Sequence, residues 1–372
     1  MKYYIVAGEA SGDLHGANLI KEINKLDPKA NIKAWGGDLM EQNGAFLAKH
    51  IRELAFMGFS EVVKNLPTIF KNISYCKKDI TEFKPDVLLL IDYPGFNLRI
   101  AKWAHQNGIK VHYYISPSVW AWKEGRGFKV KKYCDKLFVI LPFEKEFYKR
   151  YDMEVDFVGH PLLDAIAQFE NEKLTFKDFA EENQLNEKPI IALLPGSRKQ
   201  EIEVMLPEFL KMESKFPEYQ FVIAGAPSQF PDYYQKVSKG SDVKILFGQT
   251  YNLLMHSYAA LVSSGTATLE TALFGVPEVV CYKGGWASFY LARLLINVKF
   301  ISLVNLIMDK EIVTELIQGD FNAKRLESEL YSITKNENSR NKQKTEYIEL
   351  VTKLGGVGAS KRIANLMMED LQ

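Results

Sequence analysis

The feature that most constrains this chain is a series of short apolar runs, rich in β-branched and aromatic residues, that recurs along its length. Each run is followed by a turn and then by a segment whose apolar residues have helical spacing. Several runs are apolar at consecutive positions, which is typical of strands buried on both faces of a parallel sheet. The alternation of strand and helix predicts a doubly wound α/β fold. The expected strands are Tyr3–Ala7, Val87–Ile91, Val111–Ile115, Leu137–Leu141, Val155–Val158, Ile190–Leu194, Gln220–Ala224, Val243–Leu246, Ala260–Ser263 and Val279–Tyr282.

This pattern starts again after a charged stretch, 169–188, that precedes Pro189. Each half of the chain then begins with a strand and a glycine-containing turn, which predicts two Rossmann-like domains. We place the first domain at 1–168 and the second at 169–341. In such a pair, ligands are expected in a cleft at the carboxyl ends of the two sheets.

Charge and composition exclude several classes of protein. Lys and Arg number 47 and Asp and Glu 46, so the net charge of +1 gives no support for nucleic-acid binding. The three widely spaced cysteines predict a reducing compartment rather than a disulfide framework. The six histidines form no metal-ligand motif, so we expect no metal and no cofactor. No window approaches the roughly 18 uninterrupted apolar residues of a membrane span, so we expect a soluble or membrane-surface protein.

Two loops in the second half have the composition of a nucleotide site. Gly196, Ser197 and Arg198 follow the strand 190–194, where backbone amides and a guanidinium can bind phosphate. The second loop, 263–270, follows another strand and contains the small residues Ser264, Gly265 and Thr266. Its amides and hydroxyls suit a diphosphate. Glu270, about one helical turn further on, could accept hydrogen bonds from both ribose hydroxyls. A solvated arginine and an ordinary helix start are the alternatives.

Three segments of the first half also end strands with polar or aromatic residues. In the segment 8–16, glycines and a helix start suit an anion, although a tight turn capped by Ser11 or Asp13 explains the pattern equally well. Asp92 ends the strand 87–91, where a carboxylate could act as a general base or simply close a turn before Pro94. The aromatic segment 113–123 could form a pocket wall or pack in the core.

One helical pattern has an apolar face that a core or a membrane surface could cover. Its members are Val62, Val63, Leu66, Ile69, Phe70 and Ile73. Lysines surround this face, and Pro67 could begin the helix proper.

Taken together, these motifs resemble the lipid-A-disaccharide synthase family, glycosyltransferases of family 19 with the GT-B architecture. The matching segments run through most of the chain and include AGEASGDLHGANLI, IDYPGFNLRIA, ISPSVWAWKEGR, LPFEKEFY, FVGHPLLD, LLPGSRKQEIE, SSGTATLETALFGVP and FISLVNLIMDKEIVTELIQ. The EASGD and SPSVWAW segments are specific to the family, whereas many GT-B enzymes share the SGTATLE segment.

The resemblance implies a hexosyltransferase of lipid A biosynthesis. Its expected substrates are UDP-2,3-diacylglucosamine and 2,3-diacylglucosamine 1-phosphate, and its products are the β-1,6-linked disaccharide phosphate and UDP. Because the donor is α-linked, the reaction inverts the anomeric centre. The resemblance also implies a peripheral protein on the cytoplasmic face of the inner membrane, with 342–372 returning to the first domain. A homodimer, with this segment packed on its own chain or on a partner's, is left open.

The resemblance also implies roles for particular residues. The UDP side is expected to include Gly196, Ser197, Arg198, Ser264, Gly265, Thr266, Glu270 and Asn305. The acceptor side is expected to include Ser11, Gly12, His15, Ser116 and Trp120. The acyl chains of the substrates give the apolar face at 62–73 a use as a membrane-docking surface.

The chain departs from the family pattern at Gly95, where many members carry a second aspartate in the IDxPDFN segment. The catalytic base is therefore Asp92 or Asp13, and we rank Asp92 first because it ends a strand. Two alternatives remain open. One is another GT-B activity, such as a UDP-GlcNAc 2-epimerase or a peptidoglycan glycosyltransferase. The other is a UDP-sugar-binding protein without catalytic activity.

Overall fold

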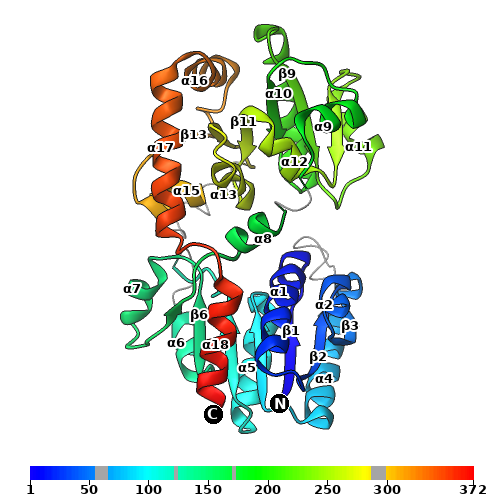
Figure 1. The fold of residues 1–372 in the computed structure, drawn as a ribbon, viewed down its shortest axis with the longest axis vertical. Helices are drawn as coiled ribbons and strands as arrows, with labels where there is room; N and C mark the ends of the chain where they lie inside the picture. Colours follow the sequence, from blue (N-terminus) through cyan, green and yellow to red (C-terminus); the bar gives the residue numbers. More distant parts are fainter. Residues whose placement is uncertain (55–65, 121–124, 170–172, 286–298) are drawn as a thin grey trace. The chain divides into compact units, whose positions relative to one another are not determined.

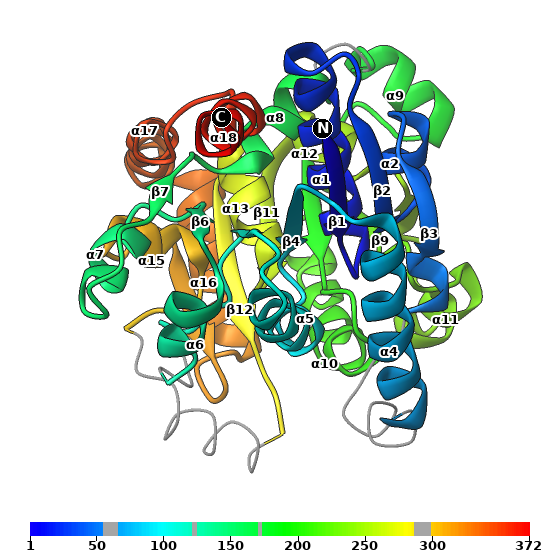
Figure 2. The same ribbon diagram turned by 90° about the horizontal axis from the view of Figure 1, so that it is seen from below.

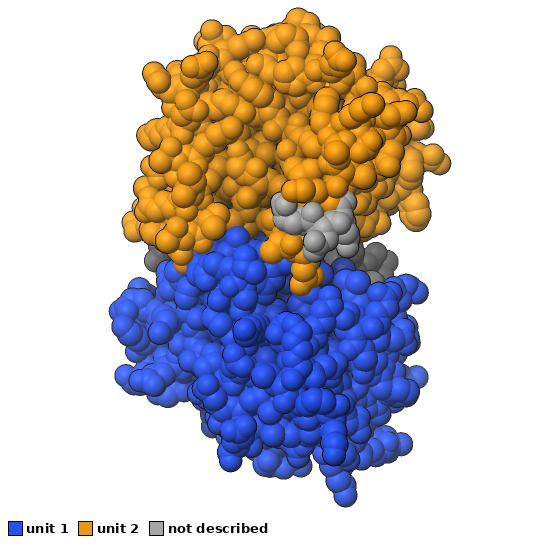
Figure 3. Space-filling view, in the orientation of Figure 1, with its two compact units in different colours: residues 1–164, 354–372 blue, residues 165–353 orange. Residues whose placement is uncertain are grey.

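The computed structural model describes residues 1–54, 66–120, 125–169, 173–285 and 299–372. The chain divides into two compact units, coloured separately in Figure 3. Unit 1 comprises 1–164 and 354–372, and unit 2 comprises 165–353. The sequence predicts boundaries after 168 and 341.

The described residues of unit 1 form a parallel sheet in the strand order β3-β2-β1-β4-β5-β6-β7 (Figure 1). Its strands are β1 Lys2–Val6, β2 Asn31–Gly36, β3 Phe46–His50, β4 Val87–Ile91, β5 Val111–Tyr114, β6 Lys136–Val139 and β7 Asp156–Phe157. Its helices are α1 Ala10–Leu26, α2 Asp38–Gln42, α4 Leu66–Phe83, α5 Pro94–Gln106, α6 Arg126–Tyr133, α7 Glu144–Lys149 and α18 Ala359–Leu371, with the 3-10 turn η1 Ile51–Glu53. Helix α8 Pro161–Phe169 carries the chain into unit 2.

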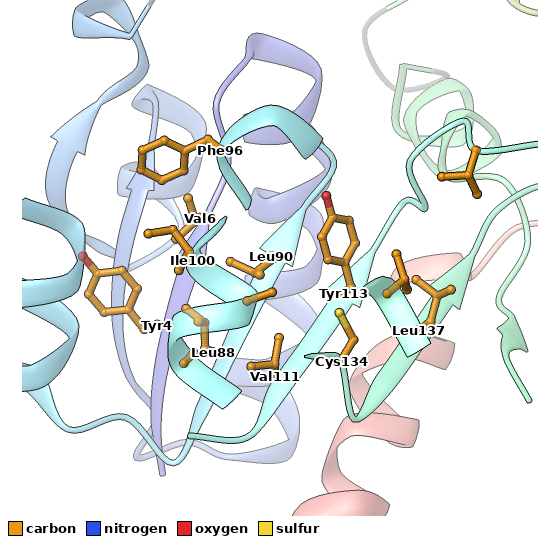
Figure 4. Packing of buried hydrophobic residues seen from close by; sticks show 14 of the residues in the cluster. Tyr4, Val6, Leu88, Leu90, Phe96, Ile100, Val111, Tyr113, Cys134 and Leu137 are labelled. Atoms are coloured by element: carbon orange, nitrogen blue, oxygen red, sulfur yellow. The ribbon is translucent and has the colours of Figure 1, made fainter. Parts of the chain in front are cut away.

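Helices cover both faces of this sheet, as the consecutive apolar residues of its strands predict. Alternate residues of β1, such as Tyr3 and Ile5, pack in a cluster that includes residues of α1 and α18. The intervening Tyr4 and Val6 pack on the other face with α4, α5 and α6. Figure 2 shows the two helical layers on opposite sides of the strands, and Figure 4 shows Phe96 among the apolar side chains of the second cluster.

The C-terminal helix α18 belongs to unit 1 because polar contacts and packing tie it there. The Asp164 carboxylate accepts hydrogen bonds from the backbone amides of Gly358 (2.5 Å) and Ser360 (3.0 Å) at the start of the helix. The Arg362 guanidinium donates to the carbonyl of Val158 at 2.7 Å. The preceding helix, α17 Glu337–Lys353, lies entirely in unit 2. Residues 342–353 therefore continue a helix of unit 2, and the return to unit 1 begins at Leu354.

The described residues of unit 2 form a second parallel sheet, in the order β10-β9-β8-β11-β12-β13. Apolar clusters fill both of its faces. Its strands are β8 Ile190–Leu194, β9 Gln220–Gly225, β10 Lys244–Phe247, β11 Ser257–Ser263, β12 Glu278–Tyr282 and β13 Thr314–Ile317. Its other helices are α9 Phe176–Asn183, α10 Lys199–Leu210, α11 Pro231–Ser238, α12 Thr250–Met255, α13 Thr266–Leu273, α15 Leu303–Met308 and α16 Ala323–Lys335, with the 3-10 turn η2 Glu213–Lys215.

The predicted α/β class with two Rossmann-like units is confirmed. All ten expected strands are present within a few residues, whereas β2, β3 and β13 were not predicted. These three strands mix polar with apolar residues, and β3 and β13 lie at sheet edges. Pairing with a neighbouring strand, which local composition does not reveal, holds them in the sheet.

Candidate active site

In unit 2, two loops meet at the place where the strand order of the sheet reverses. The chain passes from β8 to β9 and β10 on one side, and then returns to β11, which pairs with β8 on the other side. Such a switch point leaves a crevice outside the carboxyl ends of the two strands, where ligands of open α/β sheets bind. The loops 195–198 and 263–266 follow β8 and β11 directly, so both predicted UDP-binding loops lie at this point.

The first loop presents an exposed guanidinium beside a pair of backbone amides. Gly196 has a φ of +101°, and the Glu201 side chain occupies the place where a Cβ would project. The amides of Ser197 and Arg198 each donate to Glu201 Oε2 at 3.2 Å. The Arg198 guanidinium reaches Glu201 Oε1 only at 3.4 Å, and its side chain is 80% exposed. A carboxylate thus holds the loop amides, while the arginine is placed to bind an anion from solvent.

The second loop leads into α13 without a side-chain cap. Ser264 anchors the loop, because its Oγ donates to the carbonyl of Ile301 at 3.0 Å and its amide donates to Cys281. Gly265 and Thr266 are exposed, and Gly265, the residue that precedes the helix, has no side chain with which to bond the first amides. The start of α13 therefore offers backbone donors and a positive dipole end to a phosphate group.

Glu270 lies one turn into α13, as predicted, and its Oε1 accepts a hydrogen bond from the Tyr251 hydroxyl at 3.3 Å. Burial raises the pKa of Glu270 above its ordinary value, while the bond from Tyr251 opposes that rise. A carboxylate fixed by one donor at the edge of the loop could accept hydrogen bonds from ribose hydroxyls.

Asn305 of α15 is fully buried and uses both ends of its amide within unit 2. Its Oδ1 accepts from the amides of Ile312 (2.7 Å) and Val313 (3.1 Å), and its Nδ2 donates to the Val313 carbonyl and to Glu315, both at 2.9 Å. This saturation favours a structural role, joining α15 to the start of β13, over the direct nucleotide contact that the sequence predicts.

In unit 1 the strand order reverses between β1 and β4, and Asp92 lies immediately after β4. Asp92 and Tyr93 have φ values of +44° and +48°, which non-glycine residues seldom adopt outside functional or tightly held positions. The Asp92 carbonyl is held by donors from Tyr113 Oη (2.6 Å) and Asn97 Nδ2 (2.8 Å). Burial, together with the nearby charge of Glu9, raises the pKa of Asp92 to about 6. A carboxyl with this pKa is ionised near neutral pH and more basic than an exposed aspartate.

Gly95 stands in open space on the first turn of α5. A Cβ added there would meet no described atom within 4 Å, so an aspartate could be accommodated without steric conflict. By contrast, a Cβ on Gly8 would meet the Tyr93 ring at 2.4 Å, which makes glycine necessary beside the strained turn. The departure at Gly95 therefore removes a carboxylate without changing the local packing.

Asp13, the second candidate base, caps a neighbouring helix. Its Oδ1 accepts from the amides of Gly37 (2.7 Å) and Met40 (3.1 Å), and its Oδ2 accepts from Leu39 (3.2 Å). These amides lie in the first turn of α2 and just before it. Helix α2 has no other side-chain cap. The arrangement favours a structural role for Asp13 and leaves Asp92 as the stronger candidate.

The residues predicted for the acceptor side differ in accessibility. Ser11 is exposed at the start of α1, whereas Gly12 is buried with Ala7 close to it. His15 is buried, and burial lowers its pKa to about 4, so this imidazole is neutral at physiological pH. Ser11 can therefore meet a ligand directly, while Gly12 and His15 shape the interior behind it.

Ser116 and Trp120 lie in the loop after β5. Ser116 is buried, with its Oγ 2.6 Å from the Tyr148 hydroxyl, and Trp120 is half-buried against the Phe143 ring. The buried Glu144 of α7 lies beside this loop and was not singled out from the sequence. The only available signal was its place in the LPFEKEFY segment.

The predicted membrane face is only partly described, because Val62 and Val63 lie outside the described residues. Leu66 begins α4. Ile73 is buried and Ile69 packs against the same core, so these two residues belong to the interior of unit 1. Phe70 is 61% exposed and is available for an external contact.

No described helix is both long enough and apolar enough to cross a membrane. Among the same residues, no group of three or more His, Cys, Asp or Glu side chains is arranged to hold a metal ion.

Two Rossmann-like units, each built on a parallel sheet, are typical of the GT-B class of fold. Solved structures with this fold match the whole chain. A UDP-GlcNAc 2-epimerase from Neisseria meningitidis bound to UDP-GlcNAc aligns with a TM-score of 0.66 at 15% identity, covering 100% of this chain and 99% of that one. The calicheamicin glycosyltransferase CalG4 aligns with a TM-score of 0.59 at 14% identity, covering 100% and 97%. At these identities the likeness establishes the fold alone.

Sequence comparison is more specific. The family model for lipid-A-disaccharide synthetase matches residues 3–368. The lipid-A-disaccharide synthase of Syntrophus aciditrophicus is 39% identical over 367 residues, covering 97% of this chain and 95% of that protein. The chain belongs to the lipid-A-disaccharide synthase family, which consists of glycosyltransferases of lipid A biosynthesis.

Proposed function

We propose that this protein transfers 2,3-diacylglucosamine from its UDP derivative to the 6-hydroxyl of 2,3-diacylglucosamine 1-phosphate. The products are the β-1,6-linked disaccharide 1-phosphate and UDP. The observation that carries the proposal is the pair of loops after β8 and β11, which meet at the switch point of unit 2 in a chain of this family.

The donor nucleotide binds in unit 2. Arg198 and the amides at the start of α13 contact the diphosphate, and Glu270 accepts hydrogen bonds from the ribose. As the sugar–phosphate bond breaks, negative charge accumulates on the leaving diphosphate. A guanidinium and a helix N-terminus stabilise that charge more strongly than they stabilise the bound donor, which lowers the barrier.

The acceptor hydroxyl is activated by Asp92 in unit 1. The carboxylate takes the proton of the 6-hydroxyl while the oxygen attacks the anomeric carbon from the face opposite UDP. A new C–O bond forms, the bond to the diphosphate breaks, and UDP leaves with the electron pair. This single displacement inverts the anomeric centre, in agreement with an α-linked donor and a β-linked product.

A membrane-surface location on the cytoplasmic face of the inner membrane is supported by the charge of one helical layer of unit 1. Helices α4, α5 and α6, on one side of the sheet in Figure 2, carry an excess of basic residues and the exposed Phe70 and Phe128. The basic residues are Lys71, Lys77, Lys78, Arg99, Lys102, Arg126, Lys129, Lys131 and Lys132, against Asp79 and Glu82 in the same helices. In α1 and α18, on the opposite side, acidic and basic residues balance. Anionic lipid attracts such a cationic layer and brings acylated substrates to the enzyme.

Turnover with defined substrates distinguishes the candidate functions. The purified protein is incubated with labelled UDP-2,3-diacylglucosamine, with and without 2,3-diacylglucosamine 1-phosphate. Release of UDP that requires the lipid acceptor supports the synthase. Binding of the donor without turnover would instead identify a UDP-sugar-binding protein, and conversion of UDP-GlcNAc at its 2-position would identify an epimerase.

The assignment of the nucleotide site is tested by UDP affinity. We expect Arg198→Ala and Glu270→Ala each to weaken UDP binding by about tenfold or more, because each removes one hydrogen-bonding charge, worth roughly 1.5–3 kcal/mol. Isothermal titration measures the affinity. Arg325→Ala is the control, since Arg325 is an exposed arginine of α16 that pairs with Glu329. Unchanged affinity in both site variants would remove the UDP site from these loops.

A further inference from the structure

A carboxyl group lies buried at the carboxyl end of β6 in unit 1. Glu144, the first residue of α7, is 1% exposed. A buried carboxylate is costly unless hydrogen-bond donors compensate for lost water. Its environment therefore indicates what it does in the fold.

Groups from two loops surround this carboxyl. The backbone amides of Ile140 and Leu141, in the loop after β6, donate to Glu144 Oε2 at 3.2 and 2.9 Å. The side chains of Ser116 and Trp120, in the loop after β5, lie close enough to Glu144 to favour its charged form. The carboxylate thus lies between the loops that follow two adjacent strands of the sheet.

The loop after β5 needs such support because its backbone is strained. Ile115 has a φ of +62°, a conformation that is unfavourable for a β-branched residue. Strained positions persist only where the surrounding contacts determine them. The contact of Ser116 with Tyr148 and the packing of Trp120 on Phe143 hold this loop against α7 and the residue before it.

We propose that Glu144 is a positioning residue that holds the loop 115–120 in the shape that binds the acceptor glucosamine phosphate. The inference rests on the proposed function, which assigns the acceptor to unit 1. Glu144 need not touch the substrate, since it is buried behind the loop. Its contribution is to hold the loop after β6 and the start of α7, because Ser116 contacts Tyr148 and Trp120 packs on Phe143 there.

The charged form of Glu144 is the one that performs this role, because the amides of Ile140 and Leu141 donate to it and the nearby Ser116 and Trp120 side chains favour it. Burial raises the pKa of Glu144 to about 7. The groups that face it are the Ser116 hydroxyl, the Trp120 indole and the two backbone amides, with the Tyr148 hydroxyl beyond Ser116. As the pH falls through about 7, protonation places a donor against these donors and loosens the loop.

The test compares Glu144→Gln with Glu146→Gln in the full-length protein. The glutamine side chain would keep the size of the glutamate but direct an amide donor at one of the donors. We expect the KM for the lipid acceptor to rise about tenfold at pH 8, with the KM for the UDP-sugar changed less than about twofold. In the wild type the acceptor KM should rise as the pH falls through about 7, and in Glu144→Gln it should stay high and flat. Glu146, an exposed carboxylate of the same helix paired with Lys149, is the matched control and should behave as wild type.

Amide hydrogen exchange adds a readout that does not depend on turnover. At one fixed pH, Glu144→Gln should exchange faster than the wild type at Ile140, Leu141 and the segment 115–120, with unit 2 unchanged. If Glu144→Gln does not fold, Trp120→Phe removes the indole N–H beside Glu144 while leaving the carboxylate, and a smaller rise in acceptor KM is expected.

The outcomes separate this inference from the proposed function. If the wild type shows no acceptor-dependent UDP release, the proposed function fails. If the wild type turns over normally but a folded Glu144→Gln has an unchanged acceptor KM and unchanged exchange, only the positioning role is overturned. An equal rise in both KM values would also overturn it, because that pattern indicates a general structural defect.

Discussion

At the scale of single residues, two carboxylates of unit 1 illustrate how the surroundings of a residue favour either a catalytic or a structural role. Asp13 and Asp92 both follow strands and are both candidate bases by sequence. Asp13 is occupied by three backbone amides. Asp92 instead lies on a strained turn near Glu9, where burial makes it more basic. The sequence ranks Asp92 first because it ends a strand, and the tertiary contacts separate the two residues further by giving Asp13 a capping role.

The role of Asp92 as a base predicts a defined pH dependence. Asp92→Asn should lower kcat by about 10²–10⁴-fold, the usual contribution of general base catalysis, with both KM values little changed. In the wild type, activity should fall as the pH drops below about 6, because protonation of Asp92 removes the base. Glu9→Gln should move this acid limb to lower pH, since the charge of Glu9 raises the pKa of Asp92. Rates measured from about pH 5 to 8 test all three statements.

Asp86→Asn is the control for this series, because Asp86 is an exposed aspartate of unit 1 that accepts from the Lys2 amide. It should leave the profile unchanged. Turnover of Asp92→Asn within a few-fold of the wild type would assign the base to another residue.

At the scale of elements, short helices and loops depend on side chains supplied from elsewhere in the chain. Helix α2 spans only Asp38–Gln42 and receives its cap from Asp13 of α1. Helix α15, Leu303–Met308, is joined to the start of β13 by Asn305. The motifs that contain Asp13 and Asn305 can be found in the sequence. The partners of Asp13, however, lie 24 or more residues away, beyond the reach of local sequence patterns.

The capping role of Asp13 predicts a loss of stability rather than of chemistry. Asp13→Ala should destabilise unit 1 by about 1–3 kcal/mol, because it leaves buried amide donors without an acceptor. Asp13→Asn retains one acceptor oxygen and should cost less. Thermal unfolding measures the difference, and turnover per folded molecule should stay within a few-fold of the wild type. Full stability with turnover abolished would make Asp13 a candidate base again.

At the scale of the whole molecule, each unit has its own sheet and its own buried clusters. Two cores of this kind can unfold separately, so unfolding in a single transition is not assumed.

One buried acid affects the stability of unit 2 as a function of pH. Glu278 of β12 is fully buried, and neither carboxyl oxygen has a hydrogen-bond partner in the part of the chain that the structure describes.

Burial raises the pKa of Glu278 well above its ordinary value of 4.5. A group whose pKa is raised on folding contributes stability that is fully present below the unfolded value and is lost as the pH rises towards the folded value. Unit 2 should therefore lose up to about 1.4 kcal/mol per pH unit above roughly pH 4.5. Glu278→Gln should remove this slope, so that the variant gains on the wild type between about pH 5 and 8. Denaturant unfolding followed at several pH values measures the slope, and parallel curves for the two proteins would contradict the prediction.

The α/β class and most strands were determined by the sequence, because consecutive apolar residues can be buried on both faces only in a covered parallel sheet. The sequence also located the loops after β8 and β11, since glycine and small residues followed by a helix start are a local signal. Tertiary structure alone decided which acids are buried and what they contact. Asp92, Glu144 and Glu278 differ from exposed carboxylates chiefly through desolvation. Desolvation depends on segments that are distant in the sequence, so a residue's immediate neighbours do not encode it.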